Sequence, residues 1–452
     1  MFDKNFLWGA ASSAYQVEGN YLADGKGLGI WDYFGQQKKY IAHGEHGENA
    51  CDHYKRFRDD VALMKEIGLK SYRFSVSWPR VLPNGIGEIN EKGLQFYSDL
   101  VDELLLADIK PIITLYHWDM PYELHKKGGW KNPEIPNWFA EYTKLIVERL
   151  SDRVEYWITI NEPSCFAGAA YKNGAHAPFE KNDLDTMMQV CKNVFLAHGK
   201  AVSMIRKYSK KTPIVGMAPT GPVRIPENYS LEAIEIARKK TFQITEDYYI
   251  TSDAWWADPI YLGEFPEQAK EVFGDKLISF TEEEWQEVSQ SLDFCGYNIY
   301  NAEVAYEEPD GLYDTYSYQG SPKTQMDWNI TPEGMYWSAK FFYERYGKPI
   351  MITENGMAGM DWIHLDGAVH DPQRIDYMKR YLLELKRAID EGIPVIGYQY
   401  WTLMDNFEWT LGYDKRFGLI YIDYQTQKRV LKDSAYWYRD LIKNNGDGLI
   451  DK

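Results

Sequence analysis

The chain has 452 residues, of which 44% are hydrophobic and 26% are charged, proportions typical of a globular protein with a large core. Its 50 basic and 67 acidic residues give a net charge of −17, which repels phosphate backbones and anionic lipids, so we expect neither nucleic acid nor membrane as a partner. There is no C-x-x-C pair, no apolar run as long as a membrane helix and no basic segment leading into an apolar one at the start. We therefore expect free thiols in a cytoplasmic protein.

Eight short apolar or β-branched runs recur along the chain, and amphipathic helical segments separate them. The predicted strands are residues 7–16, 71–78, 110–118, 153–161, 214–219, 293–300, 349–354 and 395–403, and the clearest predicted helices are residues 54–67, 91–107 and 375–391. Gly68 directly follows the first of these helices, as expected of a helix-terminating glycine. There is no linker, internal repeat or low-complexity tract. The pattern predicts an α/β fold, a single (β/α)8 TIM barrel that spans residues 1–452.

Polar and aromatic residues stand near the end of nearly every predicted strand. They are Gln16, Glu18, Arg73, Trp78, His117, Trp118, Asp119, Asn161, Glu162, Asn298, Tyr300, Glu354 and Trp401. In a parallel barrel the carboxyl ends of the strands share one face, and active sites form there. We therefore expect one site at this face of the barrel.

Two glutamates follow strongly apolar strands, where a charge is costly unless it serves a purpose. Glu162 follows residues 157–160 (WITI), and Glu354 follows residues 350–353 (IMIT). Two carboxyl groups that converge on one point suit glycoside hydrolysis, in which one protonates the leaving oxygen and the other attacks the anomeric carbon. The alternative for each glutamate is a structural ion pair at a strand end.

Two motifs resemble the catalytic signatures of glycoside hydrolase family 1, the β-glucosidase-like family. They are residues 159–163 (TINEP) and 352–356 (ITENG), and the resemblance extends from residues 6–10 (FLWGA) to residues 416–419 (RFGL). It implies that Glu162 is the general acid/base and Glu354 the nucleophile of a retaining mechanism. It also implies a TIM barrel with no cofactor.

Further residues match the family one by one. Gln16, His117, Asn161, Trp401, Glu408 and Trp409 match the set that binds the glycone, Asn298 and Tyr300 match a pair near the nucleophile, and Arg73 matches a buried arginine beside it. Trp118 is placed with the substrate-binding residues, Trp328 resembles the tryptophan that stacks on the leaving group, and Cys165 is expected on the same side. Taken singly, His117 would be a core histidine, Arg73 a structural ion pair and the tryptophans core residues.

Metal and phosphate-binding motifs are the remaining candidates. Residues 43–46 (HGEH) contain ligand-type side chains, but no second cluster accompanies them, so a solvated loop is the preferred interpretation and no metal is expected. No glycine-rich phosphate loop is present, and Cys165 has no neighbouring base that would make it a nucleophile.

The sequence therefore predicts a retaining exo-β-glycosidase. Its expected substrates are terminal non-reducing β-D-glucosyl residues of small glycosides and oligosaccharides such as cellobiose, with β-D-galactosyl and β-D-fucosyl residues as alternatives. A 6-phospho-β-glycosidase and a non-catalytic sugar-binding barrel are the competing interpretations. A carboxylate at Glu408 would repel a sugar phosphate. The family resemblance implies a serine at this position and a Lys-x-Tyr pair downstream in the phospho-specific branch, whereas this chain has Glu408 and Lys415–Arg416–Phe417. The presence of both glutamates argues against a non-catalytic barrel. The sequence does not decide the oligomeric state, and a homo-oligomer is compatible with it.

Overall fold

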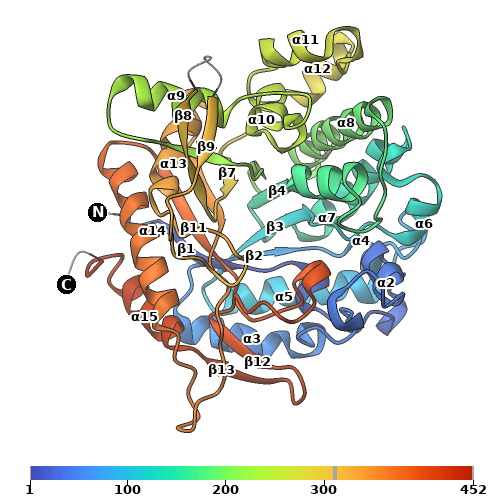
Figure 1. Cartoon of the computed structure of the whole chain (residues 1–452). Helices are drawn as coiled ribbons and strands as arrows, with labels where there is room; N and C mark the ends of the chain where they lie inside the picture. Colours follow the sequence, from blue (N-terminus) through green and yellow to red (C-terminus); the bar gives the residue numbers. More distant parts are fainter. Residues whose placement is uncertain (1, 309–312, 450–452) are drawn as a thin grey trace.

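Eight parallel strands form the centre of the molecule and helices surround them (Figure 1). The computed structural model describes residues 2–308 and 313–449. The strand order of the central sheet is β5-β4-β3-β2-β1-β11-β10-β7, and every neighbouring pair is parallel. A parallel bridge between Thr220 and Asn298 joins the chain just after β5 to β7 and closes the sheet. The predicted (β/α)8 barrel is confirmed.

The barrel strands are β1 (Leu7–Ala11), β2 (Ser71–Ser75), β3 (Lys110–Tyr116), β4 (Tyr156–Asn161), β5 (Ile214–Ala218), β7 (Cys295–Asn298), β10 (Ile350–Asn355) and β11 (Val395–Trp401). The longer helices are α3 (His53–Ile67), α5 (Glu91–Leu106), α7 (Ile135–Leu150), α8 (Leu184–Tyr208), α9 (Leu231–Thr241), α10 (Asp253–Tyr261), α13 (Glu333–Tyr346), α14 (Pro372–Asp390) and α15 (Asp433–Lys443). Shorter helical segments are α1 (Ala14–Val17), α2 (Ile30–Gly35), α4 (Trp78–Val81), α6 (Tyr122–Lys126), the π-helix η4 (Ser164–Lys172), α11 (Glu267–Phe273) and α12 (Glu282–Val288).

All eight predicted strands occur, but two end well before the predicted residue. β1 ends at Ala11, and Gln16 lies on the short helix α1. The prediction extended the strand to residue 16 because a fully buried helical turn has the same apolar pattern as a buried strand. β2 ends at Ser75, and the helix α4 follows with Pro79 in its first turn, a favourable position for proline that the strand prediction overlooked. The first predicted helix is confirmed as α3, and Gly68 ends it with φ 78°.

Apolar side chains fill the barrel on its inside as well as outside. Inside, a small cluster comprises Leu7, Ile112, Ile158, Ala218, Phe294 and Met351, which the strands and the segment before β7 contribute. Gly216 on β5 makes room for this cluster, because a Cβ there would lie 2.4 Å from the Phe294 ring. The amphipathic helices bury their apolar sides on the outside of the strands in one continuous core. The filled interior leaves the C-terminal face as the place for a cavity.

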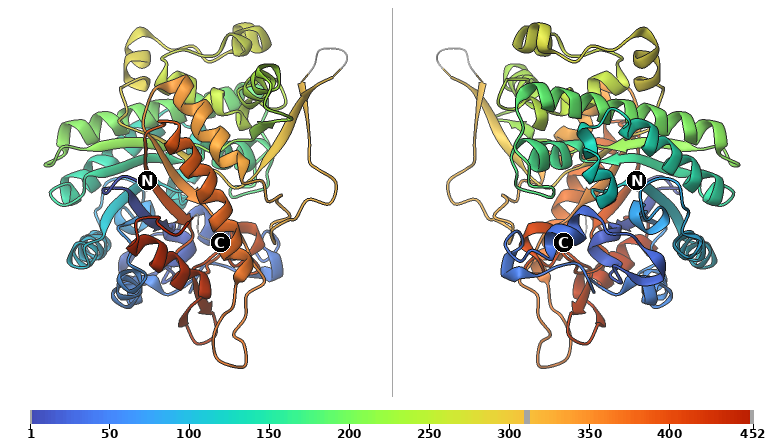
Figure 2. Two further views of the ribbon diagram at one scale, coloured as in Figure 1. Left: turned by 90° about the vertical axis from the view of Figure 1, so that its left-hand side faces the viewer. Right: turned by 90° about the vertical axis from the view of Figure 1, so that its right-hand side faces the viewer.

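Smaller elements extend the barrel at this face. One sheet consists of β6 (Val223–Pro226), β8 (Ala302–Glu307) and β9 (Tyr313–Tyr316), and a hairpin consists of β12 (Ile420–Asp423) and β13 (Lys428–Leu431). Residues 359–370, between β10 and α14, project from the body of the protein (Figure 2); we call this segment the arm. Across the described part of the chain, no helix combines the length and apolarity needed to traverse a bilayer. The four cysteines are unpaired.

Candidate active site

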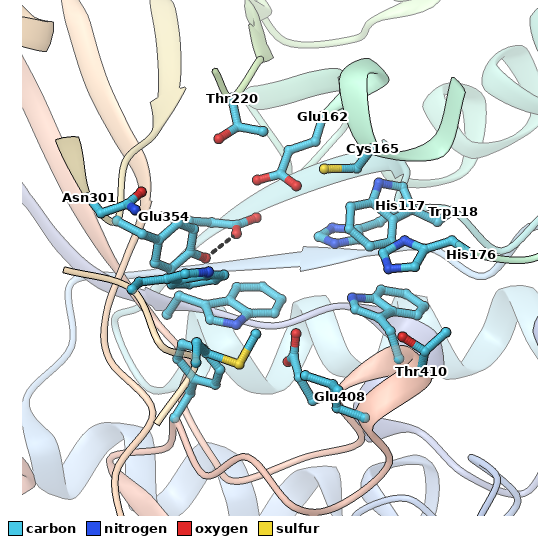
Figure 3. Close-up of a pocket in the computed structure, with 17 residues that line it drawn as sticks. His117, Trp118, Glu162, Cys165, His176, Thr220, Asn301, Glu354, Glu408 and Thr410 are labelled. Atoms are coloured by element: carbon cyan, nitrogen blue, oxygen red, sulfur yellow. Dashed lines mark hydrogen bonds between the residues drawn. The ribbon is translucent and has the colours of Figure 1, made fainter. Parts of the chain in front are cut away.

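A cavity of about 350 Å³ opens at the carboxyl ends of the barrel strands (Figure 3). Its lining consists of His117, Trp118, Glu162, Cys165, His176, Thr220, Tyr300, Asn301, Met326, Trp328, Glu354, Trp401, Glu408, Trp409, Thr410, Leu411 and Phe417. These residues come from segments far apart in sequence, and the barrel brings them together because it aligns its strand ends. Both candidate catalytic carboxyl groups lie in this one cavity.

Glu354 lies on β10, is 3% exposed and is held on both oxygens. Arg73 Nη1 donates to its Oε1 at 2.6 Å, and the Tyr300 hydroxyl donates to its Oε2 at 2.6 Å. Burial raises the pKa of Glu354, while Arg73 and Tyr300 oppose that rise by stabilising the charged form. Gly356 lets this strand end approach β11, since a Cβ there would lie 1.8 Å from the carbonyl oxygen of Trp401. The result is a carboxylate fixed in position and in rotamer.

Glu162 directly follows β4 and is 6% exposed. Asn298 Nδ2 donates to its Oε1 at 2.7 Å, but no cation contacts it within the described residues. Burial, and next the negative charge of Glu354, raise the pKa of Glu162 to about 8. Glu162 is thus protonated at neutral pH, and Glu354, with a cation and a hydroxyl on its oxygens, is the better placed of the two to hold the charge.

Three buried residues behind the cavity connect the two carboxyl groups. Arg73 Nη2 donates to Asn161 Oδ1 at 2.5 Å, and Asn298 Nδ2 donates to the same oxygen at 3.0 Å. Arg73, Asn161 and Asn298 are each at most 1% exposed, and none of them lines the cavity wall. Their places agree with a positioning function for Arg73 and Asn298. Asn161 was expected to bind the glycone, but it lies behind the wall of this cavity and not in its lining.

One wall of the cavity is aromatic. The His117 ring stacks on Trp401 and Trp409 with centroid distances of 5.7 and 6.0 Å, and Trp118 contacts Trp409 at 4.5 Å. Burial, with help from the charge of Arg73, lowers the pKa of His117 well below its usual value, so the imidazole is neutral. Neutral polar edges beside indole faces suit the mixed apolar and hydroxylated surface of a sugar.

Three residues of the cavity lining have a strained backbone. Trp118, Glu162 and Trp409 have φ values of 75°, 46° and 52°, a region that residues other than glycine rarely adopt. Such conformations persist where the surrounding structure determines them, and they are frequent at functional sites. All three residues line the cavity, which supports its assignment as the functional site.

Glu408 is the third carboxyl group of the cavity. Gln16 Nε2 donates to Glu408 Oε2 at 3.3 Å and to the carbonyl oxygen of Phe407 at 2.8 Å, while the Ser13 hydroxyl donates to Gln16 Oε1 at 2.6 Å. Gln16 is fully buried and lies behind the cavity wall. Burial, followed by the charges of Glu354 and Glu162, raises the pKa of Glu408 to about 8. Burial and the neighbouring carboxyl groups therefore disfavour any further negative charge in this cavity.

Trp328 and Cys165 also line the cavity, and Cys165 lies beside His117 and Trp118 (Figure 3). Trp328 packs against Tyr300 with a centroid distance of 5.1 Å. Burial, and next the charge of Glu162, raise the pKa of the Cys165 thiol well above its usual value. Cys165 is therefore a protonated thiol at neutral pH.

Three residues that were expected at this face lie away from the cavity. Glu18 is buried in an ion pair with Arg80, with Oε2 at 2.7 Å from Nε. Trp78 donates its Nε1 hydrogen to the carbonyl oxygen of Gly85 at 2.9 Å, and Asp119 is buried outside the cavity lining. The expectation that residues at predicted strand ends face the site was wrong for these three, because the chain turns after β1, β2 and β3, so that only some of the residues beyond each strand face the cavity.

Several lining residues were not expected. Thr220 and Asn301 directly follow the fifth and sixth predicted strands, so extending the strand-end rule by one residue would have found them. His176 lies in the irregular segment beyond η4, and burial lowers its pKa to about 4. The remaining unexpected residues are Met326, Thr410, Leu411 and Phe417. His176 and these loop residues give no periodic or motif signal in a single sequence.

The arrangement provides a fixed carboxylate, a protonated carboxylic acid and an aromatic floor in one cavity. That combination can attack an acetal carbon and protonate its leaving oxygen. Within residues 2–308 and 313–449 no three His, Cys, Asp or Glu side chains are placed to share a metal ion. His43, in the segment 43–46 considered above, has its Nε2 3.0 Å from Oδ2 of Asp414.

Comparison with known proteins gives a consistent result. Residues 1–447 match the model described as Glycosyl hydrolase family 1. A 1,4-beta-D-glucan glucohydrolase from Thermotoga neapolitana is 42% identical over 447 residues, 98% of this chain and 99% of the relative. Beta-glucosidase A from Acetivibrio thermocellus is 43% identical over 452 residues, again 98% and 99%. A solved structure of the beta-glucosidase from Thermotoga maritima in complex with glucoimidazole has a TM-score of 0.90 and 41% identity, and covers 98% of this chain and 99% of that one.

Proposed function

The chain belongs to glycosyl hydrolase family 1, and on that premise we propose that it is a retaining exo-β-glucosidase acting on small β-glucosides and short oligosaccharides. The observation that carries the proposal is the contrast between two carboxyl groups in one cavity. Arg73 and Tyr300 hold Glu354, whereas no cation among the described residues contacts Glu162, whose pKa is raised to about 8. Environments that separate two carboxyl pKa values are typical of an acid paired with a nucleophile.

In the proposed first step Glu354 attacks the anomeric carbon, the bond to the leaving oxygen breaks, and Glu162 gives its proton to that oxygen. In the second step Glu162 takes a proton from water, the water oxygen attacks the anomeric carbon, and the bond to Glu354 breaks. Two displacements at one carbon return the β configuration. The Tyr300 hydroxyl can hold Glu354 in line for attack, because it already donates to Oε2.

The glycone is proposed to be neutral. Burial, followed by the charges of Glu354 and Glu162, raises the pKa of Glu408 to about 8, so Glu408 is protonated at neutral pH and the cavity already disfavours a second negative charge beside Glu354. A dianionic 6-phosphate would bring further negative charge into this low-dielectric site. Lys415, the nearest candidate for a phosphate ligand in the sequence, donates instead to the carbonyl oxygen of Gln325 at 2.8 Å and does not line the cavity. A carboxyl group at this position can exchange hydrogen bonds with the hydroxyl groups of a neutral sugar.

A kinetic panel of 4-nitrophenyl β-glucoside, β-galactoside, β-fucoside and β-glucoside 6-phosphate tests this proposal. We expect kcat/KM for the glucoside to exceed that for its 6-phosphate at least about a hundredfold, or about 2.7 kcal/mol. Glu408→Ser should narrow the gap and slow the neutral sugar. Comparable turnover of the 6-phosphate by the unmodified enzyme would overturn the neutral-glycone proposal, and an unchanged ratio in Glu408→Ser would remove Glu408 from glycone recognition.

A further inference from the structure

A second cavity, of about 640 Å³, lies between the base of the arm and the segment 322–330. The walls of the two cavities share this segment: Met326 and Trp328 face the active site, while Thr324 and Gln325 line the second cavity. Ala358 belongs to the same partition, since it lines the second cavity and packs in one cluster with Trp401 and Phe417. The second cavity is therefore separate from the active site but adjacent to it.

An exposed tryptophan lines this cavity. Trp362 is 55% exposed, whereas the other tryptophans, all in the described part of the chain, are buried or half-buried. The His364 ring stacks on the Trp362 indole with a centroid distance of 4.8 Å and an interplanar angle of 18°. Leaving so large an apolar side chain in water forgoes burial energy, so an exposed indole in the wall of a cavity indicates a surface for a ligand.

Every charged side chain in this cavity already has a partner. Arg374 pairs with Asp361 and Asp371, Lys323 with Asp327 at 3.0 Å, and His370 lies between two aspartates. No charge is left over for an ionic ligand among the described lining residues.

The polar side-chain groups of this cavity that lack a hydrogen-bond partner are neutral, except for one nitrogen of Arg374, whose other nitrogens are in ion pairs. The side chains of Gln325, His364 and Gln373 make no hydrogen bond to other described residues, and Nε of the buried Arg374 has none. Amide groups offer a donor and an acceptor each, as hydroxyl groups require. An exposed indole and unpaired amides in one cavity, with every charge of the described lining residues paired, fit a ligand that is neutral, hydroxylated and apolar on its C–H faces.

We propose that this cavity is an accessory saccharide-binding site, with Trp362 as the stacking surface and Gln325 and Gln373 as hydroxyl partners. The choice of a saccharide as the ligand rests on the proposed function, whereas the existence of the cavity and the ion pairs of its charged residues do not. A bound saccharide would contact the segment that positions Trp328, because Thr324 N donates to the Trp328 carbonyl oxygen at 2.9 Å. The site therefore adjoins the leaving-group side of the active site.

The test is calorimetric titration of cellotriose into enzyme whose active site carries a covalent 2-deoxy-2-fluoroglucosyl group. We expect about one saccharide to bind per chain, and Trp362→Ala to weaken binding about tenfold or more, the effect of losing one aromatic contact and its buried area. Leu365→Ala is the matched control, because Leu365 is fully exposed on the same arm and does not line the cavity. Its affinity should stay within about twofold of the unchanged enzyme.

Three results would overturn the accessory site: no binding to the labelled enzyme, unchanged binding in Trp362→Ala, or binding that disappears in Trp328→Ala instead, which would place the saccharide in the active-site cavity. If no saccharide binds and both arm variants lower the oligomeric state in sedimentation, the arm is a contact surface for a second copy. Failure of the label to form would count against the proposed function alone. Titration of unlabelled enzyme with and without Trp362→Ala would then still decide the accessory site.

Discussion

Replacing Glu354 by alanine should lower kcat on 4-nitrophenyl β-glucoside by at least about 10⁴-fold, on the scale seen when a single nucleophile is removed from a catalytic unit. The alanine leaves an anion-sized space beside Arg73, whose Nη1 loses its acceptor Oε1. Added azide should occupy that space and attack the anomeric carbon in one displacement, while Glu162 protonates the leaving group. The expected product is α-glucosyl azide, identified by proton NMR.

The corresponding alanine variant of Glu162 is the matched control for this rescue. With a dinitrophenyl leaving group that needs no proton, Glu354 should still form the glycosyl intermediate, and azide should then give β-glucosyl azide after two displacements. Opposite products from the two variants would assign one carboxyl to each face of the sugar. The same anomer from both, or no azide product from Glu354→Ala, would contradict the assignment.

Replacing Glu162 by glutamine should slow substrates with poor leaving groups far more than substrates with good leaving groups. General acid catalysis contributes on the order of 10²–10⁴-fold where the leaving oxygen needs a proton. We therefore expect kcat/KM to fall by about that factor for cellobiose and to change little for 2,4-dinitrophenyl β-glucoside. Glutamine keeps the size of the side chain and an acceptor for Asn298 Nδ2, so a general loss of structure is not the expected cause. Equal slowing of both substrates would count against the acid role.

The same variant should alter the pH profile. Because the pKa of Glu162 is raised to about 8, its acid form is present below that pH and is lost as the pH rises through it. For cellobiose, kcat/KM of the unchanged enzyme should therefore fall on the alkaline side near pH 8, and this limb should be absent in Glu162→Gln. A limb that persists at the same pH in the variant would assign it to another group.

Much of the architecture could be predicted from the sequence, since the barrel depends on patterns that one chain displays. Apolar runs, intervening helices and a terminating glycine such as Gly68 are local signals, and the structure confirms the resulting barrel. Local signals were wrong where two structures share one pattern. The segment containing Gln16 is buried all round, so it has the same apolar pattern in a helix as in a strand.

The catalytic pair stands out in the sequence because each glutamate ends a strongly apolar strand, but its surroundings depend on packing. That Arg73 Nη2 and Asn298 Nδ2 share one acceptor, Asn161 Oδ1, follows from the closure of the barrel. His176 and Phe417 reach the cavity from irregular segments without periodicity. The second cavity could not be predicted from the sequence either, because the arm that carries Trp362 meets the segment 322–330 only in the folded chain.

The most direct test of the central claim is identification of the residue that bonds to the sugar. 2,4-Dinitrophenyl 2-deoxy-2-fluoro-β-glucoside should inactivate the enzyme with one label per chain. The fluorine slows both steps, but the good leaving group keeps the first step fast enough for the glycosyl-enzyme to form and accumulate. Mass spectrometry of the digested protein should place the 2-fluoroglucosyl group on Glu354. A label on Glu162, Glu408 or another residue, or hydrolysis with no label, would contradict the account.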